Sequence, residues 1–154
     1  MISLRARMRS ERGAELIEFA LVFPILLLLV LGMVDFGFLF QRYEVLTNAA
    51  REGARLYVLP GYDANDTKSR VCNFVQNGGV PITGSCPNPT NPVITPTDVT
   101  ITLSGGATVA ARRVTVRYTN SYLFVGPIIG LFGGSLSTTP ITTVAVMRKE
   151  VTTP

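Results

Sequence analysis

One short arrangement of residues in this sequence has chemical content. It is GAELIEF at residues 13–19, which joins a basic leader to a long apolar run and places Glu18 just inside that run. The helix dipole favours a carboxylate at the N-terminus of a helix, but an unpaired carboxylate inside a bilayer is expensive. Glu18 therefore either caps a helix at the membrane surface or needs a partner for its charge inside the bilayer.

Residues that could support catalysis are scarce elsewhere. The sequence has no histidine, which removes the commonest general base and the commonest metal ligand. Two cysteines alone make a poor metal site, and no G-x-S-x-G motif occurs. The acidic residues after residue 59 form no close pair suited to acid–base chemistry; they are Asp63, Asp66, Asp98 and Glu150. We predict no catalytic, cofactor or metal site and no small-molecule substrate, and hence a protein that is not an enzyme.

The positive charge is concentrated at the start of the chain. The formal net charge is +4, from 14 basic and 10 acidic side chains. Residues 1–13 hold four arginines against Glu11, so the leader carries +3 and the remaining residues only +1. The rest of the chain therefore offers no basic face for nucleic acid, and no nucleic-acid partner is expected.

The apolar run predicts a membrane anchor. Residues 19–40 contain one charged side chain, Asp35, and would form about 33 Å of helix, enough for a hydrocarbon core of about 30 Å. The leader arginines predict a cytoplasmic N-terminus. Pro24 lacks an N–H and should kink the helix. Asp35 lies near the outer end, where it is either a plain carboxylate at the interface or a residue with a role of its own.

The anchor is expected to continue as an amphipathic stalk to residue 59. Apolar residues recur every three to four positions over residues 41–59, and no helix breaker precedes Pro60-Gly61. Ala49-x-x-x-Gly53 and a second small pair one residue later form a face that another element can approach closely. This face packs either on the protein's own head or on another chain. We therefore divide the chain into a leader (1–13), a transmembrane helix with its stalk (14–59) and an extracytoplasmic head (60–154).

The head is predicted to be a small α+β domain. Asp66-Thr67 is a reasonable N-cap pair for a short helix over residues 68–76, which Asn77-Gly78-Gly79 should end. Prolines argue against regular structure between residues 79 and 96. Strand patterns at 98–104, 112–124 and 140–149 indicate a three-stranded antiparallel sheet, with Gly105-Gly106 in its first turn. The apolar connection 124–135 should pack on the sheet or dip toward the membrane.

Cys72 and Cys86 lie beyond the anchor, on the side where an oxidising environment permits a disulfide. A bridge would enclose 13 residues and tie the proline-rich loop to the short helix. On the chain-entropy model, closing a loop of that size contributes about 3 kcal/mol. The alternative is a pair of free, buried thiols.

The N-terminal third resembles the TadE-like family, pseudopilin-like proteins of tight-adherence (Flp) pilus assembly. The resemblance covers RGAELIEFALVFPILLLLVLGMVDFGFLF at residues 12–40 and NAAREGAR at 48–55, and more loosely PIIGLFGGS at 127–135 and VAVMRKE at 144–150. It implies cleavage by a prepilin peptidase between Gly13 and Ala14, so that Glu18 becomes the fifth residue of the mature chain.

The same resemblance implies other partners and a location. The partners would be further pilin and pseudopilin subunits and the pilus assembly machinery, and the location the bacterial inner membrane, with the head outside the cytoplasm. Major pilins of this system are very short, so a head of about 100 residues favours a minor or assembly component. Two alternatives remain: a minor pseudopilin of a related type II-like secretion machine, and an unprocessed single-pass protein whose head binds a partner at the cell surface.

Overall fold

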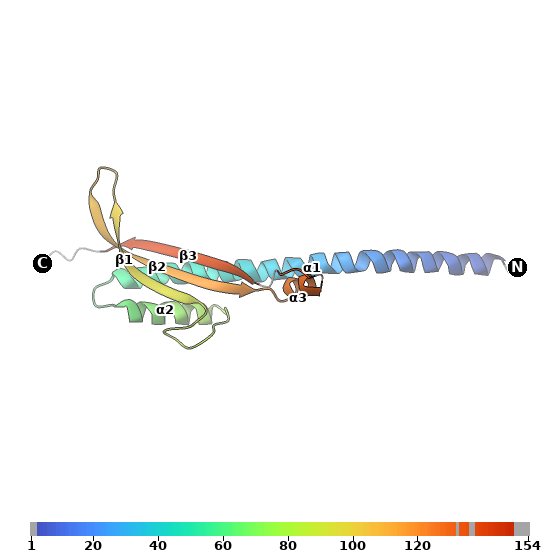
Figure 1. The fold of residues 1–154 in the computed structure, drawn as a ribbon, viewed down its shortest axis with the longest axis horizontal. Coiled ribbons are helices and arrows are strands. Elements are labelled where there is room, and N and C mark those ends of the chain that lie inside the picture. Colours follow the sequence, from blue (N-terminus) through green and yellow to red (C-terminus); the bar gives the residue numbers. More distant parts are fainter. Residues whose placement is uncertain (1–2, 132, 136–137, 150–154) are drawn as a thin grey trace. The chain divides into compact units, whose positions relative to one another are not determined.

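The computed structural model describes residues 3–131, 133–135 and 138–149. The elements follow the order α1 (Ser3–Val58), α2 (Ala64–Asn77), β1 (Val93–Thr102), β2 (Thr108–Ser121), α3 (Val125–Leu131) and β3 (Thr138–Arg148) (Figure 1). The chain forms two compact units. One holds α1 up to Gly37 together with the segment that contains α3, and the other holds the rest of α1, α2 and the sheet. The predicted α+β class, with a long N-terminal helix, a short helix (α2) and three strands, is confirmed, and α3 is a further short helix.

Helix α1 is a single helix of 56 residues. It continues through Pro24, and the kink at that residue stays a prediction. Within the described residues, Gly13–Val58 is the one helix long and apolar enough to cross a membrane, with a mean hydropathy of 2.7 over its best window. No residue of that window is buried within the structure. The described part of the chain thus has one candidate single-pass anchor.

Helix α2 begins earlier than the sequence pattern predicted. Its N-cap is Asp63, whose carboxylate accepts hydrogen bonds from the backbone N–H groups of Asn65 and Asp66 at 2.7 and 2.9 Å. Asp66 completes a capping box by accepting from the Asp63 N–H at 3.1 Å. Asp66-Thr67 was therefore the wrong N-cap pair, because both residues already belong to the first turn. The predicted stop is confirmed, since α2 ends at Asn77 and Gly79 has a φ of 74°.

The sheet is antiparallel, with the order β1-β2-β3. Gly105 and Gly106 have φ values of 127° and 84° in the predicted turn between β1 and β2. Strand β1 starts at Val93, although the prolines argued against a strand before residue 98. Pro96 is paired with Val114 of β2. A proline is tolerated there because β1 is an edge strand, whose outward N–H groups need no partner in the sheet.

The core of the second unit lies between α1, α2 and β2. Its fully buried members are Leu46 and the small residues Ala49, Ala50 and Ala54 of α1, Val71, Cys72 and Val75 of α2, and Val114 and Val116 of β2. A Cβ at Gly53 would collide with Val71 Cγ2 and would lie 3.5 Å from Val114 Cγ1. The small-residue face of α1 therefore packs on the protein's own head, the first of the two alternatives (Figure 1).

Candidate functional site

The junction between leader and apolar run lies inside α1. Residues 13–18 are helical, and the side chains of Ala14 and Glu18 are exposed. Ala14 and Glu18 are four residues apart, which places them on one face of the helix, one turn from each other. A Cβ added at Gly13 would meet nothing within 4 Å. Packing within this chain therefore does not require glycine at position 13.

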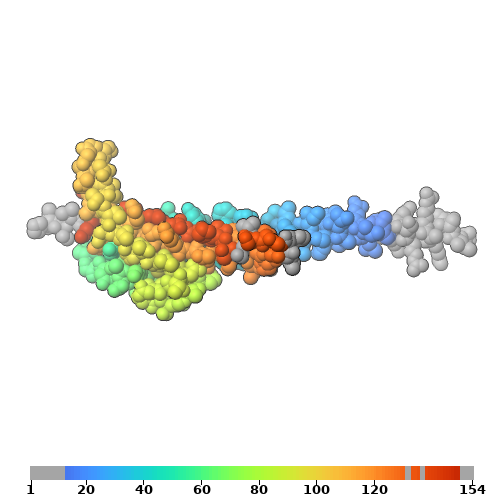
Figure 2. All heavy atoms as spheres, viewed as in Figure 1, coloured from blue at the N-terminus to red at the C-terminus, as the bar shows by residue number. Residues whose placement is uncertain are grey.

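The helix that follows the junction presents its apolar side chains outward. Phe19 and Phe23 stack with ring centroids 5.3 Å apart, and the large apolar residues from Leu16 to Val34, except the half-buried Leu31, are at least two-fifths exposed. These side chains lie at the surface of the segment coloured blue in Figure 2. A helix with apolar side chains all around needs lipid or another apolar surface to cover it. This is the arrangement of a membrane anchor.

Asp35 has a defined structural role within the first unit. The residue is buried, with 3% of its surface exposed. Oδ1 accepts from the Leu123 N–H at 3.0 Å, and Oδ2 accepts from the N–H groups of Phe124 and Val125 at 3.0 and 2.7 Å. Val125 is the first residue of α3, and Leu123 and Phe124 directly precede it; the sequence did not reveal this helix within the connection 124–135. Asp35 is therefore the cap of a helix 90 residues further along the chain, and not simply a carboxylate at the interface.

The predicted disulfide is present in the second unit. Cys72, fully buried in α2, is bonded to Cys86 in the following loop, with their Cα atoms 5.8 Å apart. Among the described residues there is no cluster of three or more histidine, cysteine or acidic side chains that could hold a metal ion. The bridge thus has a structural role, the tying of the loop to α2.

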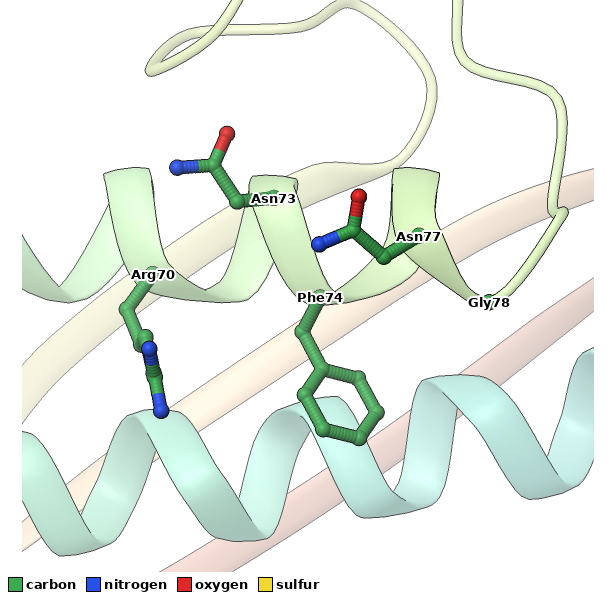
Figure 3. A pocket seen from close by; sticks show the side chains of 5 residues that line it. All are labelled: Arg70, Asn73, Phe74, Asn77 and Gly78. Atoms are coloured by element: carbon green, nitrogen blue, oxygen red, sulfur yellow. The ribbon is translucent and has the colours of Figure 1, made fainter.

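A hollow on α2 does not form a convergent binding site. It is lined by Arg70, Asn73, Phe74, Asn77 and Gly78. In Figure 3, Arg70 and Phe74 point toward the neighbouring helix, while Asn73 and Asn77 point away from it. The Arg70 guanidinium is already paired with the Glu52 carboxylate at 2.9 Å. The polar groups are thus either engaged or divergent, and nothing here organises a ligand.

The family comparison covers the junction, the apolar helix and the small-residue face. The matching family model is described as TadE-like protein and spans residues 13–55. Residues 13–55 are a TadE-like segment. The chain gave no match among curated proteins or solved structures. The TadE-like segment starts at Gly13 and stops shortly before α1 ends at Val58, so α2, the sheet and α3 lie outside it.

The TadE-like family is associated with pilus assembly and with a membrane anchor. It is a structural, pilus-associated family, and the match to its model is confined to residues 13–55 of this chain. The segment contains every residue of the candidate junction, from Gly13 to Glu18, and also Asp35. The elements that Asp35 and the small-residue face contact belong to the rest of the chain.

Proposed function

We propose that this protein is a pseudopilin-like structural component of tight-adherence (Flp) pilus assembly, anchored by α1 and cleaved after Gly13 by a prepilin peptidase. The observation that carries the proposal is the TadE-like match over residues 13–55. Its support in the structure is an exposed junction at the start of an exposed apolar helix. The anchor lies in the inner membrane with the N-terminus in the cytoplasm, because the leader holds four arginines.

Cleavage would create the charge that Glu18 needs. Hydrolysis of the amide between Gly13 and Ala14 adds one water, leaving a carboxylate on Gly13 and an α-ammonium group on Ala14. That ammonium would lie one helical turn, about 6 Å along the axis, from Glu18. In an assembly of parallel helices, Glu18 of one subunit can pair with the ammonium of its neighbour. Because an unpaired carboxylate in the bilayer is costly, the pairing favours assembly in register.

Glycine at position 13 is then a requirement of the peptidase. A side chain there would meet no other atom of this chain within 4 Å, so intramolecular packing gives no reason for it. A narrow substrate pocket in the peptidase would explain the need for glycine. The head, with about 100 residues, makes a minor or assembly component of the pilus the favoured role.

The test of processing is the intact mass of the protein from cells that contain a prepilin peptidase. We expect the mass of residues 14–154 for the wild type and the full-length mass for Gly13→Leu. Recovery of only the full-length wild-type chain would contradict the proposal.

The test of Glu18 uses Glu15→Gln as the matched control, since both carboxylates are exposed on α1. We expect Glu18→Gln to reduce strongly the amount of mature chain that co-purifies with other pilin subunits, because the neighbouring ammonium loses its partner. Glu15→Gln should behave as the wild type. Equal co-purification of both variants would refute the pairing role of Glu18.

A further inference from the structure

A long stretch of the chain after Arg117 has no charged side chain. From Tyr118 to Met147 the sequence contains no Asp, Glu, Lys or Arg. In its middle, residues 122–130 read YLFVGPIIG and include α3, which belongs to the same compact unit as the N-terminal part of α1. The Leu123 side chain is 64% exposed, and Phe124, Ile128 and Ile129 are only half-buried. An apolar segment in the unit of the anchor is thus left partly uncovered.

The position of Asp35 indicates the depth of this segment. Asp35 lies 16 positions after Phe19, the start of the apolar run, which corresponds to about 24 Å of helix. If the hydrocarbon begins at Phe19, Asp35 lies within its last ~6 Å, since the layer is about 30 Å thick. The three backbone N–H groups bonded to Asp35 lie at that depth too.

The bonds between Asp35 and the start of α3 satisfy both partners. A carboxylate inside the apolar layer is costly without donors, and the first N–H groups of a helix are costly there without an acceptor. Asp35 supplies the acceptor and residues 123–125 supply the donors. Since water could serve both groups outside a membrane, the reciprocal arrangement has its greatest value where water is absent.

We propose that residues 123–130 are a second membrane contact of this protein, seated against lipid at the outer boundary of the bilayer and fastened to α1 by Asp35. Their exposed apolar surface contacts the acyl chains and the glycerol region of the lipids in the outer leaflet. The inference goes beyond the proposed function, because it needs the anchor but neither cleavage nor pilus assembly. Asp35 acts in it as a positioning residue.

The test places spin labels on the full chain in phosphatidylcholine nanodiscs that hold one copy each. Labels go on cysteines introduced at Leu123 and at Gly130, where a Cβ meets nothing within 4 Å. The native cysteines are bonded to each other and do not react. Met33, 65% exposed on α1, serves as the lipid control. Ser104, exposed in the β1–β2 turn, serves as the water control.

We expect labels at 123 and 130 to be relaxed by oxygen rather than by a water-soluble nickel complex, as at Met33 and opposite to Ser104. Labels at 123 and 130 that behave like Ser104, while Met33 is in lipid, would overturn the inference. A water-accessible Met33 would overturn the anchor and the inference together. Discs with two copies test whether a second copy of the chain, rather than lipid, covers the apolar surface of residues 123–130. Spin–spin coupling between the two copies, together with loss of lipid exposure, would assign the surface to that second copy and would also overturn the proposal.

The fastening role of Asp35 has its own readout, the mobility of the label at Gly130. Asp35→Leu removes both acceptor oxygens and should give a more mobile label with less lipid exposure. Asp35→Asn keeps one acceptor oxygen and should have an intermediate effect, which keeps the test valid if the leucine variant does not fold. Val34→Leu, at the neighbouring exposed position of α1, should leave the spectrum unchanged. An unchanged spectrum in both Asp35 variants would refute the role.

Discussion

Gly53 shows how a single residue limits the distance between elements. It lies on the part of α1 that meets α2 and the sheet, and a Cβ there would collide with Val71. Gly53→Ala should lower the free energy of unfolding. The gain in helix propensity is about 1 kcal/mol, but overpacking a buried contact costs about 1–3 kcal/mol. We expect a lower denaturation midpoint of the full chain in detergent micelles.

Two further variants separate these effects. Gly37→Ala places a Cβ on the same helix where nothing lies within 4 Å, so it should not lower the midpoint. Adding Val71→Ala to Gly53→Ala removes the colliding methyl groups, so the loss in the double variant should be smaller than the sum of the two single losses. Additive losses would contradict a direct contact between residues 53 and 71.

Asp63 gives a pH dependence with a defined sign. Hydrogen bonds from the backbone N–H of Asp66, and next from that of Asn65, lower the pKa of the Asp63 carboxyl below its ordinary value of 3.8. A carboxyl whose pKa is lower in the folded state stabilises the fold above its unfolded pKa, and this contribution is lost as pH falls through the folded pKa. The stabilisation should therefore be constant from pH 7 to about 5 and decline below about 4.

The matched variant for this effect is Asp63→Asn, because asparagine is an equally good N-cap without a charge. We expect the wild type to exceed this variant in denaturation midpoint near neutral pH, and the difference to shrink below about pH 4. A difference that stays constant down to pH 2 would show that the charge of Asp63 does not stabilise α2.

At the scale of elements, the disulfide determines how the proline-rich loop is held to α2. Cys72 and Cys86 are separated by 14 positions. Replacing both with alanine should lower the free energy of unfolding by about 3 kcal/mol, since the unfolded chain regains the entropy of an open loop. Denaturation with and without a thiol reductant measures the effect. The reductant should shift the midpoint of the wild type only; a shift in the double variant would mean that it acts elsewhere.

The long helix, the sheet and the disulfide could be predicted because their signals are local. The apolar run, the alternation in the strands and the two cysteines each stand within one short stretch. Strand β1 was predicted too short, because whether Pro96 interrupts a strand depends on β1 being at the edge of the sheet. The strand order is a property of the whole fold, and the sequence of β1 does not contain it.

Helix α3 could not be predicted because its cap is remote. Its own sequence, VGPIIGL, contains two glycines and a proline and is preceded by no Ser, Thr, Asp or Asn cap. Pro127 lies in its first turn, where a proline does no harm. The acceptor for the first N–H groups is Asp35, far back in the anchor. The sequence signal for this contact was a lone carboxylate near the end of an apolar run, which is equally compatible with a plain carboxylate at the interface and does not identify a partner.

At the scale of the whole molecule, the leader, the anchor and the disulfide depend on one another. Three of the four net positive charges lie in residues 1–13, and these charges favour a cytoplasmic N-terminus. In the proposed orientation the head is exported, which would bring Cys72 and Cys86 to an oxidising compartment where their bond can form. We therefore predict that the orientation in the membrane and the disulfide of the head both depend on the same arginines.

This dependence can be tested in cells with the leader arginines at positions 5, 7, 9 and 12 replaced by glutamine. We expect a fraction of the chains to insert with the head in the cytoplasm. There the cysteines stay reduced, so thiol labelling of Cys72 and Cys86 under denaturing conditions should rise from near zero in the wild type. Replacing Arg113 and Arg117, which are exposed on β2, removes positive charge from the head and should not increase labelling. Complete oxidation in the leader variant would show that the arginines do not orient the chain.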